Sequence, residues 1–430
     1  MGDGMKKMLR FAVVLGVAAL ALGQQRCEAK VSRKQAAAWR AEIRKELSIS
    51  DPLPELAPES HGSFSPVAGV VAERVTYGTE YGMRIPAIVY RPADEGDIKR
   101  PGIVVVNGHG ADKSSWYSYY TGVLYARAGA VVVTYDPAGE NERNDEHKSA
   151  TGEHDKKIDV PGVPQRLGGL MVTDAMEAVS YLDQRPDVDP KRIAVLGFSM
   201  GSFVSVLTGA VDTRVHALLL TGGGDIDGPE GYWDKSAPMC QGGPYRSLSV
   251  LGDRPAVIYA LNALRGPTFI LNGTADTVVD IPHHEADYFE AMRKRVIALN
   301  GPKNVFETYF VAKASHRPAW IMKVPALWLE KQLKFPNWTA KKVEAMPVVS
   351  IGAWAAQVGL PLNKSAQRED RDAGIPALAA DVPRLTQEQL NVLPEAEWEK
   401  EKGRFVYSVW AKHAIADATG SSGGAKPKPE

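Results

Sequence analysis

The stretch Arg192-Ile-Ala-Val-Leu-Gly-Phe-Ser-Met-Gly201 decides the fold of this chain. Its first five residues predict a buried β-strand, and the residues after Gly201 have the composition of a helix. A sharp Gly-x-Ser-x-Gly turn between a strand and a helix strains the Ser backbone, and it needs the glycines because a Cβ there would collide with neighbouring backbone. We therefore interpret Ser199 as a nucleophile. An ordinary glycine-rich turn is the alternative interpretation.

On both sides of this turn, continuous apolar runs alternate with helical patterns. Strands that are apolar on both faces and separated by helices are typical of a parallel sheet covered on both sides. A predicted antiparallel hairpin, residues 75–77 and 85–90, precedes them and indicates a sheet edge. The sequence therefore predicts an α/β fold with a mostly parallel central sheet and helices on both faces. The expected parallel strands are residues 102–107, 130–135, 192–196, 215–220, 267–271 and 305–310.

The N-terminus has the pattern of an export signal. Lys6, Lys7 and Arg10 precede an apolar run over residues 11–22, and small or polar residues follow. We expect a signal peptide over residues 1–29, with cleavage after Gly23 or Ala29, and an exported protein in the periplasm or outside the cell. An uncleaved anchor helix is the alternative, but the run is short for a membrane span.

The rest of the chain divides by composition. Trp39, Ile43 and Leu47 have helical spacing and predict a helix that braces or covers the main domain. Near the C-terminus, residues 404–410 fit either a strand or a short helix. The expected segments are an N-terminal helical segment (30–66), a catalytic domain (67–335), a C-terminal appendage of unknown role (336–418) and a disordered tail rich in Gly, Ser, Pro and Lys (419–430).

Composition excludes some classes of partner and of scaffold. Among 430 residues, Lys plus Arg and Asp plus Glu both number 51, so no overall field attracts nucleic acid or an anionic membrane. The two cysteines, Cys27 and Cys240, cannot provide a disulfide framework. No stretch after residue 30 is apolar for long enough to cross a bilayer, so we expect no stable membrane association after signal cleavage.

A serine nucleophile needs a base and an acid that orients the base. In a fold of this kind they follow the serine in the order acid, then histidine. Asp276 comes just after the strand expected at 267–271, and His316 comes after the strand expected at 305–310. These positions place both residues at the carboxyl ends of strands, where open α/β sheets bind ligands. We therefore predict a Ser199, Asp276 and His316 triad.

Alternatives to these two residues remain. Asp276 could be the N-cap of the next helix, and Asp225 and Asp227 are the competing acids after the preceding strand. His283 and His284 lie before the last strand and His216 lies inside one, so their positions favour His316 as the base.

An oxyanion needs two backbone N–H donors, one after the nucleophile and one from the loop after an early strand. The first is Met200. The second comes from Asn107-Gly-His-Gly110, and we assign it to the backbone of His109 or Gly110. A plain glycine-rich turn is compatible with the same residues.

Aromatic residues after this loop and in the insertion before residue 267 have two interpretations. They could form a wall for a sugar or aryl ester, or they could pack a lid against the core. The residues are Trp116, Tyr117, Tyr119, Tyr120, Tyr232 and Trp233, of which Trp116, Tyr117, Tyr232 and Trp233 are the candidate substrate contacts.

The acidic stretch 140–159 invites a metal interpretation, because it carries Asp145, His147, His154 and Asp155. Its spacing matches no compact ligand motif, and a solvated loop accounts for the charge equally simply. We therefore expect a solvated loop, no metal and no cofactor.

Taken together, these motifs resemble a known family. The Asn-Gly-His-Gly loop, Tyr135-Asp-Pro-Ala-Gly139, the run from Arg185 to the turn at Ser199, and Gly273-Thr-Ala-Asp276 are similar to those of the acetyl xylan esterase and dienelactone hydrolase-like branch of the α/β-hydrolases. The similarity covers about residues 35–335 and implies the α/β-hydrolase fold and ester hydrolysis. Ser199 stands where dienelactone hydrolases carry Cys, and Asn107 stands where the superfamily often has His.

Three functions follow, in order of preference. The first is a carboxylic-ester hydrolase for small-molecule or polysaccharide esters such as acetylated plant polysaccharide. The second is a peptidase of the prolyl oligopeptidase type, against which the lack of a recognisable upstream propeller counts. The third is a catalytically silent fold that serves as a binding protein.

Overall fold

A computed structural model describes residues 31–94, 96, 98–226, 241–362 and 372–420 of the chain. The predicted signal peptide, Asp227, Tyr232, Trp233 and Cys240 lie outside these residues, as does the C-terminal tail from residue 421. At the start of that predicted tail, Thr419 is the last residue of a helix and Gly420 is its C-cap.

A nine-stranded sheet forms the centre of the molecule, in the order β1-β2-β3-β5-β4-β6-β7-β8-β9. Strands β4 to β9 run parallel to one another, and β1 to β3 add an antiparallel edge. The predicted hairpin is β2 and β3, with Val75 opposite Ala87, and the predicted mostly parallel sheet is confirmed. The strands are β1 (Glu59–Val67), β2 (Val70–Gly78), β3 (Arg84–Pro92), β4 (Arg100–Val106), β5 (Val131–Tyr135), β6 (Val188–Phe198), β7 (Ala217–Thr221), β8 (Thr268–Gly273) and β9 (Glu307–Val311), and a separate pair is β10 (Val348–Ser350) with β11 (Pro376–Leu378).

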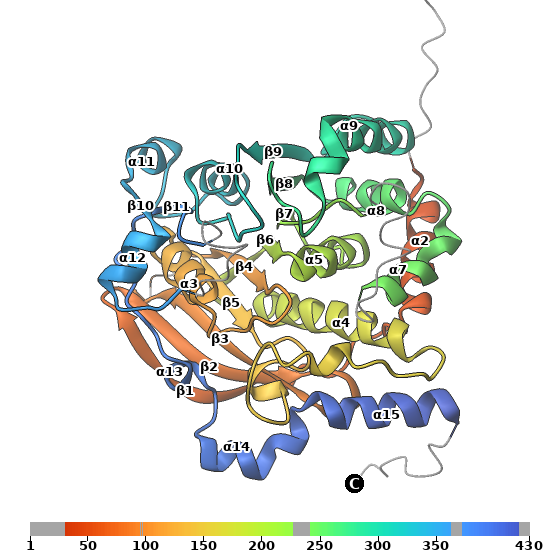
Figure 1. Ribbon diagram of the computed structural model, residues 1–430, viewed down its shortest axis with the longest axis horizontal. Coiled ribbons are helices and arrows are strands. Elements are labelled where there is room, and N and C mark those ends of the chain that lie inside the picture. Colours follow the sequence, from red (N-terminus) through yellow and green to blue (C-terminus); the bar gives the residue numbers. More distant parts are fainter. Residues whose placement is uncertain (1–30, 95, 97, 227–240, 363–371, 421–430) are drawn as a thin grey trace, which may run out of the picture.

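Helices cover both faces of the sheet (Figure 1). Side chains along each strand alternate between the faces, so Ile103 and Val105 belong to the core layer that includes α3, α10 and α12, whereas Val104 and Val106 belong to the layer that includes α4, α5 and α8. This alternation explains why the central strands are apolar at every position. The longer helices are α2 (Arg33–Glu46), α3 (Trp116–Ala128), α4 (Val163–Asp183), α5 (Met200–Val211), α8 (Arg254–Ala263), α9 (Ile281–Asn300), α10 (Lys323–Leu333) and α15 (Tyr407–Thr419), and the shorter ones are α7 (Gly242–Ser247), α11 (Ala340–Ala345), α12 (Ile351–Gln357), α13 (Gln387–Leu390) and α14 (Glu395–Glu401).

The N-terminal segment is only partly helical. The predicted helix is α2, which buries Ile43 and is fixed to α5 where Arg40 Nε donates to the carbonyl of Ala210 at 3.0 Å. The expectation of a helical segment as far as residue 66 is wrong, because residues 59–67 form β1. No residue of β1 is fully buried, so backbone pairing with β2 holds this edge strand, and its sequence carries no apolar alternation that could have revealed it.

The C-terminal segment contributes to the same core as the rest of the chain. Trp338 and Trp354 pack with α3 on one face of the sheet, and Trp410 of α15 packs with α4 on the other. Residues 404–410 contain the start of α15 and no strand. The indole of Trp410 donates to Glu80 Oε2 at 2.9 Å, and burial raises the pKa of Glu80 to about 7.

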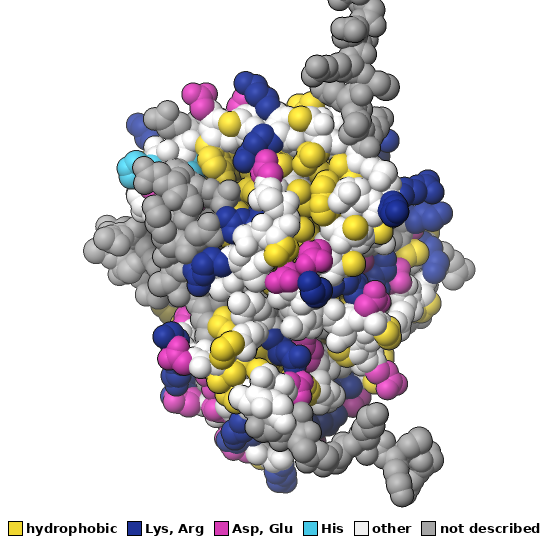
Figure 2. Space-filling view, turned by 90° about the vertical axis from the view of Figure 1, so that its right-hand side faces the viewer, with side chains coloured by type: hydrophobic (Ala, Val, Ile, Leu, Met, Phe, Trp, Pro, Cys, Tyr) yellow, Lys and Arg dark blue, Asp and Glu magenta, His cyan; other side chains and the backbone are white. Residues whose placement is uncertain are grey.

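Positive and negative side chains are interspersed on the face shown in Figure 2, in keeping with the balanced overall charge. Among the described residues, none of the helices combines the length and the apolar character needed to cross a bilayer.

Replacing Trp410 tests whether α15 is part of the core. Trp410→Ala removes an indole that is 1% exposed, together with the hydrogen bond that it donates to Glu80. We expect the free energy of unfolding to fall by about 3–5 kcal/mol, measured by urea denaturation. Lys412→Ala, at an exposed position of the same helix, should change it by no more than about 0.5 kcal/mol. Equal effects of the two substitutions would contradict a core role for α15.

Candidate active site

The carboxyl ends of the parallel strands meet at one edge of the sheet, and the candidate residues lie there. Ser199 follows β6, Asp276 lies three residues after β8, and His316 lies five residues after β9. Because these strands are parallel, their following loops share one side of the molecule. The topology thus brings together residues that are far apart in the sequence.

Ser199 occupies the sharp turn that its motif predicts. Its backbone has φ 55° and ψ −118°, between the end of β6 at Phe198 and the start of α5 at Met200. A side-chain-bearing residue seldom adopts a positive φ, and the surrounding structure must hold it there. The Ser199 N–H donates to the carbonyl of Thr221 at 2.9 Å, which fixes the turn against β7.

The two glycines of the motif are required by close backbone approach. A Cβ at Gly201 would lie 2.2 Å from the carbonyl oxygen of Val106 in β4, and a Cβ at Gly197 would lie 2.3 Å from the carbonyl oxygen of Gly201. Both distances are far below van der Waals contact. The start of α5 therefore lies directly against the end of β4.

Asp276 and His316 form a buried pair. His316 Nδ1 lies 2.8 Å from Asp276 Oδ2, and Asp276 Oδ1 accepts the backbone N–H groups of Val278 at 3.0 Å and Val279 at 3.3 Å. The carboxylate is thus fixed at both oxygens. A carboxylate at Nδ1 favours the tautomer that carries its proton there, which leaves Nε2 able to accept a proton.

The ring of His316 lies beside the turn that carries Ser199. Its centroid is 4.8 Å from that of the Phe198 ring. Gly222, at the end of β7 with φ 59°, provides the space, because a Cβ there would lie 2.8 Å from His316 Cε1 and 2.9 Å from Phe198 Cε2. The imidazole therefore packs against the residue that directly precedes Ser199.

The competing acid Asp225 follows β7 at the same edge of the sheet, but it faces a different histidine, His284. Asp225 is 3.7 Å from His284 and both side chains are fully buried, so burial raises the pKa of Asp225 to about 7 and lowers that of His284 to about 4. The negative charge of Asp276 adds to the shift of Asp225. His283 is exposed and pairs with Asp280. His216 directly precedes β7, at the opposite edge of the sheet.

The loop after β4 is anchored by its side chains. Asn107 Nδ2 donates to the carbonyl of Tyr135 at 3.0 Å, and Asn107 Oδ1 accepts the hydroxyl of Ser118. The Gly108 N–H donates to the hydroxyl oxygen of Tyr117 at 3.1 Å, so it is already occupied. The predicted oxyanion donors from this loop, His109 and Gly110, are the residues that follow.

The other predicted donor, Met200, is the first residue of α5. The N–H of a first helical residue has no partner within its helix. The positive end of the helix dipole adds to its attraction for an anion.

The predicted aromatic wall is wrong for Tyr117. Its side chain is 5% exposed and packs between Phe198 and Trp320, with its hydroxyl behind the loop after β4. Tyr119 and Tyr120 are also buried, and half-buried Trp116 donates from Nε1 to Asp372 at 3.1 Å. The packing alternative therefore describes these residues, while Tyr232 and Trp233 lie outside the described part of the chain.

The expectation of a solvated loop over residues 140–159 is wrong in part: residues 140–144, His147 and His154 are buried, whereas the rest of the stretch is half-buried or exposed. Lys113 Nζ lies 2.5 Å from Asp136 Oδ2 and 2.5 Å from Glu142 Oε2. The positive charge of this buried lysine offsets the cost of burying the two carboxylates. His154 is fully buried, and burial followed by the charge of His109 lowers its pKa to about 4. A hydrogen bond with Asp155 raises the pKa of His109.

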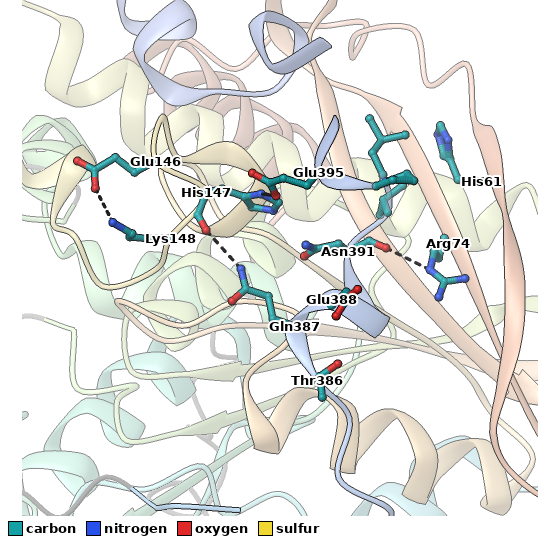
Figure 3. A pocket seen from close by; sticks show the side chains of 13 residues that line it. His61, Arg74, Glu146, His147, Lys148, Thr386, Gln387, Glu388, Asn391 and Glu395 are labelled. Carbon is teal, nitrogen blue, oxygen red and sulfur yellow. Dashed lines mark hydrogen bonds and ion pairs between the residues drawn. The ribbon is translucent and has the colours of Figure 1, made fainter. Parts of the chain in front are cut away.

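A cavity of about 840 Å³ lies between residues 146–148, the edge of the sheet and residues 386–395 (Figure 3). His147 Nδ1 lies 2.7 Å from Glu395 Oε2 there, and Arg74 donates to the carbonyl of Asn391 at 3.1 Å. Neither Ser199 nor His316 lines it, so His147 belongs to a different part of the molecule from the candidate active site.

Replacing Gly201 tests the turn geometry. Gly201→Ala would place a Cβ 2.2 Å from the carbonyl oxygen of Val106, so α5 must move. We expect a loss of stability of at least about 1–3 kcal/mol in thermal or urea unfolding. Gly403→Ala, where a Cβ meets nothing within 4 Å, is the matched control and should be nearly neutral. Unchanged stability of Gly201→Ala would show that the turn is not held in this way.

Comparison with known proteins agrees with this architecture. The model of the acetyl xylan esterase family matches residues 22–221, which include Ser199 and the loop after β4 but not Asp276 or His316. The solved structure of the methylesterase BT1017 has a TM-score of 0.58 and 20% sequence identity, over 90% of this chain and 76% of that chain, and shows a shared fold.

Two curated bacterial relatives match shorter parts. The uncharacterized protein PA2218 of Pseudomonas aeruginosa is 28% identical over 167 residues, which is 38% of this chain and 40% of that protein. The uncharacterized peptidase YuxL of Bacillus subtilis is 28% identical over 243 residues, 52% of this chain and 33% of that protein. The chain therefore spans less than half the length of either relative. The chain has the α/β-hydrolase fold, and over residues 22–221 it resembles the acetyl xylan esterase family.

Proposed function

We propose that the protein is a serine hydrolase that cleaves small acyl esters, such as acetyl groups on plant polysaccharide, through an acyl-enzyme intermediate and without a cofactor. One observation carries the proposal: the strained Ser199 turn lies at the same sheet edge as the imidazole of His316, which is itself paired with Asp276. A nucleophile, a base and an orienting carboxylate are the parts that acyl transfer requires.

In the first half-reaction, Ser199 Oγ attacks the ester carbonyl carbon while His316 Nε2 takes the hydroxyl proton. Asp276 holds the imidazole in the required tautomer and stabilises the imidazolium. The backbone N–H of Met200 and that of His109 or Gly110 stabilise the oxyanion. The tetrahedral intermediate then collapses, and the alcohol leaves with the proton from His316.

In the second half-reaction, water replaces the alcohol. His316 takes a proton from the water, the hydroxide adds to the acyl carbon, and the second tetrahedral intermediate uses the same oxyanion donors. Collapse of this intermediate breaks the bond to Ser199 Oγ, which recovers its proton from His316. The acid is released and the free enzyme is restored.

Two observations bear on the substrate. The family match favours acetyl esters, and the predicted signal peptide fits a polymer outside the cytoplasm. Ser199, in place of Cys, argues against dienelactone. Peptide cleavage is the second candidate, because YuxL is described as a peptidase.

Substitutions of the nucleophile and the base test the mechanism. Ser199→Ala and His316→Ala should each lower kcat on p-nitrophenyl acetate by ~10³-fold or more, and the double variant should be little worse than either, because the residues act as a unit. A fluorophosphonate probe should label the wild-type protein at Ser199 and leave Ser199→Ala unlabelled, as read by peptide mass spectrometry.

Other outcomes would redirect the proposal. Near wild-type turnover by Ser199→Ala, or labelling at another serine, would contradict the mechanism. Faster turnover of peptide anilides than of p-nitrophenyl esters and acetylated xylan by the wild-type protein would replace the esterase with the peptidase.

A comparison of two buried carboxylates tests the acid. Asp276→Asn removes the charge that faces His316 Nδ1 and should lower kcat by ~10³-fold or more. Asp225→Asn, at an equally buried aspartate that faces His284, is the matched control and should keep most of the activity. Loss of activity in Asp225→Asn alone would overturn the assignment of Asp276.

A further inference from the structure

Two histidines and an aspartate converge beside the candidate active site. His109 comes from the loop after β4, and His154 and Asp155 come from the 3₁₀ helix η3 (Glu153–Asp155). One nitrogen or oxygen from each of the three lies within 4.8 Å of the others. His109 Nε2 is 2.7 Å from Asp155 Oδ2, and His154 Nε2 is 3.8 Å from Asp155 Oδ1.

The buried member of this cluster lacks a well-formed hydrogen bond. The His154 side chain is fully buried, and among the described residues neither of its ring nitrogens has a partner at good hydrogen-bond geometry, although the backbone carbonyl of Ala138 is close enough to act on its pKa. Leaving a buried polar group unsatisfied costs about 1–3 kcal/mol, so such a group needs an explanation. A ligand bound at Nε2, on the side of Asp155, would supply one.

The other nitrogen of His154 faces a second buried carboxylate. His154 Nδ1 lies 3.6 Å from Glu140 Oε1, an oxygen that is likewise buried and makes no hydrogen bond. A histidine that binds a metal through one nitrogen usually directs the N–H of the other toward a carboxylate. Glu140 is placed for that role, and its other oxygen is fixed by the N–H of Ala150 at 2.7 Å.

We propose that His109, His154 and Asp155 bind one divalent transition-metal ion, for which Zn²⁺ is the best match. Two imidazoles and one carboxylate suit Zn²⁺, whereas Ca²⁺ and Mg²⁺ prefer sites made of oxygen. The side chains of His109 and Asp155 are 39% and 32% exposed, which gives the ion an entry path and leaves a position for water.

The three side chains must adjust to form the site, because their ligand atoms lie within 4.8 Å of one another but not yet at coordination spacing. Zn²⁺ bonds of about 2.1 Å place the ligand atoms of a tetrahedral shell roughly 3.4 Å apart. The contact between His109 and Asp155 must then lengthen, and the gap between His154 and Asp155 must shorten, each by roughly half an ångström or a little more. The ion would fix η3 to the loop after β4, and it takes no part in the proposed ester chemistry.

Metal binding by the untagged full-length chain tests the proposal. The protein is stripped with a chelator, titrated with Zn²⁺ in a calorimeter and assayed for bound metal after gel filtration. We expect one Zn²⁺ per chain, with an affinity at least about 10-fold lower in Asp155→Asn and in His154→Gln. Co²⁺ in place of Zn²⁺ should give visible d–d absorption bands that Asp155→Asn abolishes.

Matched controls separate this site from adventitious surface binding. Asp159→Asn removes an exposed aspartate four residues from Asp155, and His283→Gln removes an exposed histidine, and neither should change the affinity. Circular dichroism checks that each variant folds. If His154→Gln does not fold, the Zn²⁺ affinity of Asp155→Asn, at a partly exposed position, tests the proposal. Absence of stoichiometric Zn²⁺, wild-type affinity in Asp155→Asn, or loss of binding in His283→Gln would each overturn the proposal.

Discussion

The organisation of the candidate active site depends on one set of interactions, the buried ion pairs between the ammonium group of Lys113 and two carboxylates. Lys113 Nζ lies 2.5 Å from both Asp136 and Glu142, and all three side chains are buried. Burial alone would lower the pKa of Lys113, but the two carboxylates more than offset it and hold the pKa above its usual range. Loss of Lys113 leaves two buried carboxylates without their cation, and breaking a buried ion pair in this way typically costs about 3–5 kcal/mol.

This group of charges connects three parts of the chain at the active edge of the sheet. Lys113 lies in the turn before α3, Asp136 directly follows β5, and Glu142 accepts the backbone N–H groups of Val392 and Leu393 at 2.9–3.1 Å. Asn107 ties the loop after β4 to the same end of β5. The proposed oxyanion loop is therefore anchored by polar contacts to the end of β5 and to α3, so its backbone has a fixed position before a substrate arrives.

The sequence predicted those features whose signals are local. The apolar strands and the Ser199 turn are encoded within a few residues each, and the order of strands then placed Asp276 and His316 at one edge. Their contact agrees with that order, while their catalytic roles stay predictions. Edge strand β1 was missed because backbone pairing rather than an apolar face holds it.

Long-range partners account for the other errors. The burial of Glu142 could not be foreseen because its compensating groups are Lys113 and a segment 250 residues further along the chain. The burial of Tyr117 could not be decided from composition, since it depends on Trp320 and Phe198 on distant elements. In the same way, no spacing rule connects His109 with Asp155, which meet only through the fold.

The contact between Glu142 and residues 392–393 also sets an order of events during synthesis. Until those residues leave the ribosome, Glu142 lacks the two backbone N–H groups that donate to it. By then, all nine strands of the sheet that carries Ser199 have already been synthesised. A nascent chain at that stage holds a partly satisfied cluster of charges beneath its future active site, which favours an open, loosely packed edge. Residues 392–393 would then close a site whose candidate chemical groups were all synthesised earlier.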